Sequence, residues 1–169
     1  PCNIVYPNNE NEGKPFKFDI DPIDENDYEI IDKKIGEGTF GSVFKVRQKK
    51  NSDLIYAAKI SKKEINIETQ NKDSMDFFRE VLILSKMHHP SIIKFIGYTS
   101  NDFSNNPRPM IITNFMPNGS LAEVIDSERK SDSPSQWDNT KKLLNIYGIA
   151  SAMKFIHSLN ILHRDLKPA

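Results

Sequence analysis

The sequence predicts an α+β fold, in which a five-stranded antiparallel sheet with one helix precedes a helical segment. Residues 28–60 contain three short runs in which apolar and polar side chains alternate, which is the period of a β-strand. Residues 91–98 and 109–115 add two further strand-like runs. Residues 74–87 repeat apolar side chains at helical spacing, and residues 138–158 form a longer, more apolar helical run. The strands and the first helix suffice for a self-contained antiparallel unit.

Composition limits the classes of partner. The 169 residues carry 23 Lys and Arg against 23 Asp and Glu, so no net charge favours a nucleic acid or a membrane surface. The single cysteine, Cys2, excludes an internal disulfide and a zinc site built from several cysteines. Neither a bilayer-spanning apolar run nor a secretion signal is visible. We therefore expect a cytoplasmic protein with neither nucleic acid nor membrane as partner.

Changes in composition divide the chain into three parts. Residues 1–27 are rich in proline and asparagine and predict a linker or tail. Residues 28–116 contain the predicted sheet and its helix. Residues 117–169 open with an Asn-Gly turn and continue into the helical part. Within the tail, three alternating apolar residues could pack on a neighbouring surface, although a loosely docked arm is the favoured interpretation. They are Phe16, Phe18 and Ile20.

A glycine-rich stretch joins the first two predicted strands. It reads Ile35-Gly36-Glu37-Gly38-Thr39-Phe40-Gly41-Ser42-Val43. Such a backbone bends sharply, and its N–H groups can approach an anionic ligand closely. The spacing alone would fit a dinucleotide site, but there a helix follows the third glycine, whereas here a strand-like run follows. Nor does the stretch end in the Gly-Lys-Ser/Thr of a Walker A loop. The pattern therefore predicts a hairpin that covers a phosphate.

A lysine on the third predicted strand is a candidate partner for that phosphate. Ala57 and Lys59 share one face, because side chains alternate along a strand. If this face lies under the hairpin, Ala57 forms the floor and Lys59 places its charge at the phosphates. Glu80 lies in the apolar stripe of the first helix, where a carboxylate is costly to desolvate without a partner. Alone it would be an edge residue reaching solvent, but an ion pair with Lys59 is the better interpretation.

The C-terminal stretch concentrates titratable groups. Ile161-Leu162 is interpreted as a buried strand-like pair, and His163-Arg164-Asp165 follows it. Asp165 could accept a proton or orient a hydroxyl, and Lys167 could neutralise a phosphate. A charged surface turn is the alternative. The adjacent His88 and His89 have no third ligand at suitable spacing, so we favour a helix-end role over a metal site.

The last predicted helix has an unusually broad apolar stripe. Such a stripe implies burial among further helices that these residues do not supply, and exposed it would promote association. Two of its members, Tyr147 and His157, are expected in the core. The stripe comprises Leu143, Leu144, Ile146, Tyr147, Ile149, Ala150, Met153 and His157.

Together these motifs resemble the eukaryotic protein kinases, over residues 28–169. The residues that carry the resemblance are the glycine stretch, Ala57 and Lys59, Arg79-Glu80, His89-Pro90 and His163-Arg164-Asp165-Leu166-Lys167-Pro168. The resemblance implies a protein-kinase-like fold, with a complete N-lobe and the first helices of a C-lobe. The Asp-Leu-Lys run is similar to serine/threonine-specific kinases. Residues 116–121 and the Phe-Arg-Glu of the first helix resemble the tyrosine-kinase-like group.

The resemblance also implies roles around ATP and Mg²⁺. The glycine hairpin covers the ATP phosphates, with Phe40 at its tip, and Val43 and Ala57 enclose the adenine. Lys59 contacts the α- and β-phosphates while Glu80 orients it. At the back of the adenine pocket the resemblance implies a gatekeeper, Thr113, and a hinge whose main chain binds the adenine edge. The hinge comprises Asn114, Phe115 and Met116.

For phosphoryl transfer, the resemblance makes Asp165 the residue that receives the proton of a protein serine or threonine hydroxyl. The metal-binding asparagine and the Asp-Phe-Gly motif are absent, so we expect no metal ligand within this chain and no kinase activity from these 169 residues alone. The complete protein is expected to be active. The alternatives are a pseudokinase-type scaffold or nucleotide-binding module and, less favoured, a small-molecule phosphotransferase.

Overall fold

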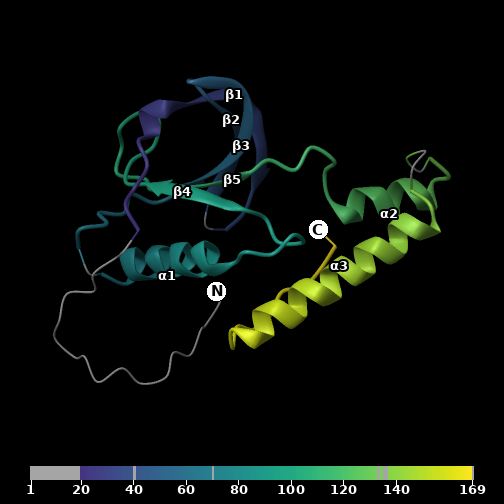
Figure 1. The fold of residues 1–169 in the computed structure, drawn as a ribbon. Coiled ribbons are helices and arrows are strands. Elements are labelled where there is room, and N and C mark those ends of the chain that lie inside the picture. The colour runs from purple at the N-terminus through teal and green to yellow at the C-terminus, as the bar shows by residue number, and fades with distance from the viewer. Residues whose placement is uncertain (1–19, 40, 70, 133, 135–136, 169) are drawn as a thin grey trace. The chain divides into compact units, whose positions relative to one another are not determined.

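A computed structural model describes residues 20–39, 41–69, 71–132, 134 and 137–168 (Figure 1). Contacts divide the chain into two compact units. The sheet unit contains the described residues up to His88 together with Ile93–Met116. The helical unit contains His89–Ile92 and the described residues from Pro117 onward.

The sheet unit contains the five antiparallel strands and the helix that the periodicities predict, preceded by a short 3-10 turn, η1 (Glu25–Asp27). The strand order is β1-β2-β3-β5-β4, so β1 and β4 lie at the edges. The elements are β1 (Tyr28–Glu37), β2 (Gly41–Gln48), β3 (Asn51–Ser61), α1 (Lys72–Lys86), β4 (Phe95–Thr99) and β5 (Met110–Asn114).

Each face of the sheet carries its own apolar cluster. On one face Val46, Ala58 and Ile112 are fully buried and pack with Tyr28. On the other face, Phe77 and Val81 of α1 pack against Tyr98 and Ile111. The opposite faces follow from alternation, because Ile111 and Ile112 are neighbours on β5.

Helix α1 begins two residues before the predicted run of 74–87 and ends one residue before its end. The Asn71 side chain accepts a hydrogen bond from the Ser74 amide at 2.9 Å, which satisfies one of the free donors of the first turn. Its buried residues, Ser74, Phe77 and Val81, recur at spacings of three and four and therefore share one face. Among the strands, β4 makes the main contacts with α1, and Figure 1 shows the helix beside this edge strand.

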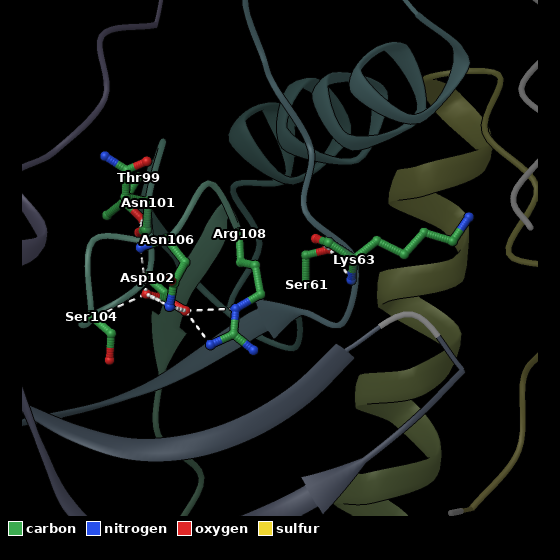
Figure 2. Close-up of polar contacts among 8 residues, drawn as sticks. All are labelled: Ser61, Lys63, Thr99, Asn101, Asp102, Ser104, Asn106 and Arg108. Atoms are coloured by element: carbon green, nitrogen blue, oxygen red, sulfur yellow. Dashed lines mark hydrogen bonds and ion pairs between the residues drawn. The ribbon is translucent and has the colours of Figure 1, made fainter.

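The loop between β4 and β5 is organised by a buried carboxylate (Figure 2). Asp102 is only 2% exposed, and it accepts hydrogen bonds from the Ser104 amide at 2.9 Å, the Asn106 amide at 3.0 Å and Arg108 Nε at 2.6 Å. Burial acts to raise the pKa of Asp102, but the bonds from Asn106, Ser104 and Arg108 outweigh it and lower the pKa. The Asn, Ser and Pro residues of this segment are typical of a loop. They do not predict that the ionised Asp102 carboxylate holds it together.

The helical unit contains α2 (Leu121–Arg129) and α3 (Asn139–Ser158). Ser120 caps α2 as its position suggests, because its hydroxyl accepts from the Glu123 amide while the Glu123 carboxylate accepts from the Ser120 amide. Asp138 caps α3 in the same way, by accepting from the Lys141 amide at 2.8 Å. Among the described helices, none combines the length and hydropathy needed to cross a bilayer.

Helix α3 exposes most of its apolar stripe. Leu143 is 66% exposed and Tyr147 71%, and among the residues of α3 only Ile156 is buried. The prediction that Tyr147 and His157 lie in a core is therefore wrong for this chain, because both residues are exposed on the surface of α3. The interpretation of Ile161-Leu162 as a buried strand-like pair is also wrong. No described strand pairs with it, and Leu162 is 59% exposed.

Candidate functional site

The predicted nucleotide-binding positions on three strands share one face of the sheet. β2 pairs with β3 so that Val43 lies opposite Lys59, and β3 pairs with β5 so that Ala57 lies opposite Thr113. Ala57 and Lys59 are two residues apart, so all four side chains project to the same side. Ile111, opposite Lys59, belongs to the cluster under α1. The face is thus the one that the helix partly covers.

The ion pair predicted between strand and helix is present. Lys59 Nζ lies 2.6 Å from Glu80 Oε1. The side chains are 36% and 42% exposed, so both charged groups remain accessible to solvent. Glu80 lies between Phe77 and Val81 in sequence, and their burial directs that side of α1 toward the sheet. An accessible ammonium group held in one direction can bind a further anion.

The packing of the hairpin requires glycine at one of its three glycine positions and not at the other two. A Cβ atom on Gly41 would lie 2.6 Å from the Ile60 carbonyl oxygen, so glycine is needed there for β2 to approach β3. A Cβ on Gly36 or Gly38 would meet nothing closer than 3.6 Å or 4.0 Å, and neither glycine has a positive φ. The packing of the described chain does not require glycine at these two positions. Both leave room beside the backbone for a ligand.

Glu37 makes two ion pairs at the base of the hairpin. Glu37, at the end of β1, pairs with Lys34 and also with Lys62, whose Nζ lies 2.8 Å away. Hydrogen bonds from Lys34 and Lys62 lower the pKa of Glu37 to about 2. Ile35 is 45% exposed on β1, and Ser42 lies opposite Glu37 on β2. Thr39 is in the connecting turn, and Phe40, the predicted tip, lies outside the described residues.

The predicted hinge follows β5. The Asn114 amide already donates to the Lys94 carbonyl at 3.0 Å, so it is occupied within the chain. Met116 is 51% exposed. Lys45 Nζ lies 4.9 Å from the Phe115 ring centroid, a cation–π contact. Sequence reasoning missed Lys45, although the alternation of β2 places it on the same face as Val43.

The C-terminal loop belongs to the helical unit. Lys167 Nζ lies 3.0 Å from Asp165 Oδ2, and the two side chains are 56% and 72% exposed. Arg164 has a left-handed φ of 63°, which is uncommon for a residue with a side chain. The Ala122 amide of α2 donates to the Pro168 carbonyl at 3.1 Å, so the loop is attached to α2. The arrangement presents a carboxylate and an ammonium group to solvent.

The histidine pair at the end of α1 makes structural contacts. His89 Nδ1 accepts from the Ser91 amide at 3.1 Å, so the ring proton is on Nε2, which lies 3.0 Å from Ser151 Oγ. The ring also stacks on Phe155 with centroids 5.4 Å apart. Within the described part of the chain, no group of three His, Cys, Asp or Glu side chains could hold a metal ion.

A cavity of about 330 Å³ opens on the opposite face of the sheet, between the strands and the β4–β5 loop, and its lining includes Glu37 and Ser42 of the glycine stretch. Four charged residues line it, and they pair with one another, Glu37 with Lys62 and Asp102 with Arg108. Its lining therefore offers no uncompensated charge to a ligand, and we assign it no function.

Comparison with known proteins identifies the family. The model of the protein kinase domain matches residues 29–169. The serine/threonine-protein kinase CTR1 of Arabidopsis thaliana is 34% identical over 140 residues, which cover 81% of this chain and 15% of that protein. The chain therefore belongs to the protein kinase family.

Two further relatives are also named as kinases. Interleukin-1 receptor-associated kinase 1 of Mus musculus is 34% identical over 79% of this chain, and Aurora kinase of Saccharomyces cerevisiae is 32% identical over 85%. The chain spans only 18% and 35% of their lengths. It therefore corresponds to only a part of each relative.

Proposed function

We propose that the protein containing this chain is an ATP-dependent protein serine/threonine kinase, which transfers the γ-phosphate of ATP to a hydroxyl group of a protein substrate. The observation that carries the proposal is the pair of Lys59 and Glu80 at 2.6 Å, on the sheet face that begins at the glycine hairpin. The family match and the names of the relatives support it.

The sheet unit fits the nucleotide. Lys59 is an accessible ammonium group for the α- and β-phosphates, and Glu80 fixes its direction. Gly36 and Gly38 leave the space that a phosphate chain needs. Val43 and Ala57 supply apolar surface for the adenine. Because the Asn114 amide is occupied, the main-chain groups of Phe115 and Met116 are the candidates for its polar edge.

Bound ATP with Mg²⁺ would supply the phosphoryl group, and we assign no metal ligand within the described residues. Asp165 accepts the proton of the substrate hydroxyl, and Lys167, paired with it at 3.0 Å, balances negative charge near the transferring group. The Asp-Leu-Lys run favours serine and threonine as acceptors. Residues 116–121 favour the tyrosine-kinase-like group.

Replacement of Lys59 tests the nucleotide site. We expect Lys59→Met to weaken binding of Mg·ATP by roughly tenfold or more, because a charge-assisted contact to phosphate is lost. Lys63→Met is the matched control, since Lys63 is 73% exposed and pairs only loosely with Asp73 at 3.6 Å. Titration calorimetry on the 169-residue chain measures both. Equal affinities of wild type and Lys59→Met would remove Lys59 from the phosphate site.

Transfer is tested separately in the complete protein, with a basic protein as substrate. Asp165→Asn should abolish incorporation of phosphate while leaving Mg·ATP affinity unchanged, because the carboxylate acts on the hydroxyl and not on the nucleotide. If the wild-type protein binds Mg·ATP but transfers no phosphate, a nucleotide-binding scaffold replaces the kinase proposal.

A further inference from the structure

Residues 20–23, which we call the edge arm, lie along the outer edge of β4. The Ile23 amide donates a hydrogen bond to the Tyr98 carbonyl at 2.8 Å, and Tyr98 Oη donates to the Ile20 carbonyl at 3.1 Å. Figure 1 shows this segment, the first coloured part of the chain, passing beside β4 before it enters β1. The arm is therefore bonded to the sheet at two points, which differs from a loosely docked tail.

The edge arm contacts both faces of the sheet. Ile23 packs against the cluster that contains Tyr28 and Val46. A Cβ atom on Gly97 of β4 would lie 2.8 Å from Ile23 Cγ2, so glycine is needed at position 97 to admit this side chain. Ile20 packs on the other face, against the cluster formed with α1. Phe16 and Phe18, the other alternating residues, lie outside the described residues.

Tyr98 connects the edge arm to the helix. It is 4% exposed, and its ring makes edge-to-face contacts with Phe77 and Phe78 of α1, with centroids 6.0 Å and 5.7 Å apart. Burial and the nearby Asp21 carboxylate raise the pKa of Tyr98, so the hydroxyl stays protonated and keeps donating to Ile20. One side chain thus contacts the arm through its hydroxyl and α1 through its ring.

The position of Glu80 depends on this packing. In its ion pair with Lys59, both side chains are more than one-third exposed to solvent. Exposed ion pairs of this kind contribute little to holding two elements together. Apolar contacts of α1 with β4, in the cluster against which Ile20 also packs, are the stronger constraint on the helix. The ion pair is therefore mainly a consequence of the position of α1 and contributes little to fixing that position.

We propose that the edge arm positions α1, and through it Glu80 against Lys59, with Ile20 as the positioning residue. Its consequence for catalysis rests on the proposed function. Loss of Ile20 leaves a gap beside the apolar cluster that α1 forms with β4 and β5, and lets α1 move away from β4. A smaller fraction of the molecules then holds Lys59 in its binding orientation. The apparent affinity for nucleotide falls in proportion to this fraction.

The test uses Ile20→Ala in the 169-residue chain, with Ile20→Val as the conservative variant and Leu54→Ala as the control. Leu54 is 41% exposed on β3 and outside both apolar clusters. Hydrogen exchange of the α1 amides, relative to those of β2 and β3, needs no ligand. Affinity for Mg·ATP is measured in parallel, with and without Glu80→Gln.

We expect Ile20→Ala to accelerate exchange in α1 selectively and to weaken Mg·ATP binding about fivefold, with Ile20→Val and Leu54→Ala close to wild type. Added to Glu80→Gln, it should weaken binding no further, since both act through Lys59. Acceleration spread evenly over α1, β2 and β3, or full additivity with Glu80→Gln, would overturn the inference. If the wild-type chain does not bind Mg·ATP, the nucleotide site that the proposed function assigns to the sheet unit fails, and the exchange pattern alone decides the role of the arm.

Discussion

At the scale of single residues, identical amino acids in the glycine hairpin serve different purposes. Gly41 is required by the chain itself, because the Ile60 carbonyl oxygen would lie 2.6 Å from any Cβ. Among the residues that the structure describes, Gly38 has no such neighbour. Its amide donates to the Gly41 carbonyl at 2.9 Å, which closes the turn without using a side chain. The sequence shows the spacing but not this division of roles.

Alanine substitutions separate these roles. Gly41→Ala should lower the free energy of unfolding by about 1–3 kcal/mol, because the new methyl group overlaps a backbone oxygen. Gly38→Ala should leave the melting temperature nearly unchanged and weaken Mg·ATP binding, because its Cβ enters the space assigned to the phosphates. Thermal melts and nucleotide titrations on both variants check this. Equal losses of stability would show that Gly38 is structural as well.

At the scale of elements, the β4–β5 loop and α1 are each fixed by one side chain with several partners. Asn71 caps α1, and Asp102 collects the donors of its own loop. A carboxylate with 3% side-chain exposure is stable there only because amide and guanidinium donors compensate its desolvation. Such a loop can support an edge strand, because its conformation is specified by hydrogen bonds and not by length alone.

Asp102→Asn tests that compensation. We expect a loss of about 1–3 kcal/mol in the free energy of unfolding near neutral pH, since Arg108 and the loop amides lose their charged acceptor. Because the folded pKa of Asp102 is lowered, its contribution is present above the ordinary value of 3.8 and is lost as the pH falls through the folded pKa. Denaturant unfolding should therefore show wild type and variant converging in acid. Asp53→Asn, an exposed change on β3, is the control and should show neither effect.

At the scale of the whole molecule, the two units differ in how well they bury apolar surface. The sheet unit has apolar clusters on both faces. Helix α3, in contrast, exposes several large side chains, among them Leu143 at 66% and Ile146 at 65%. Contiguous exposed apolar surface of this kind promotes association.

We expect the 169-residue chain to self-associate through α3. Leu143→Lys combined with Ile146→Lys should reduce the average mass measured by light scattering and leave the unfolding of the sheet unit unchanged, because neither residue contacts a core. Leu54→Lys, at a single exposed site on β3, should not change the mass. A wild-type chain that is monomeric at all concentrations, or equal hydrogen-exchange protection in both units, would contradict this expectation.

Much of the site could be predicted because local patterns carry it. The alternation of β3 places Ala57 and Lys59 on one face, and an acidic residue in the apolar stripe of α1 needs a partner, so the pair of Lys59 and Glu80 was accessible to reasoning. Periodicity also gave the five strands and the helices α1 and α3. In each case the information lies within a few residues, where side-chain direction is fixed by secondary structure.

What only the tertiary structure decided concerns residues far apart in the chain. Nothing local indicates that Ile23 fills the space left by Gly97, that Tyr98 bonds to Ile20, or that β5 lies between β3 and β4. The sequence alone likewise placed Tyr147 in a core, because an apolar side chain shows that it favours burial but not whether a partner is present. Side-chain direction is a local property, whereas contact requires two segments to meet, and that is determined by the fold.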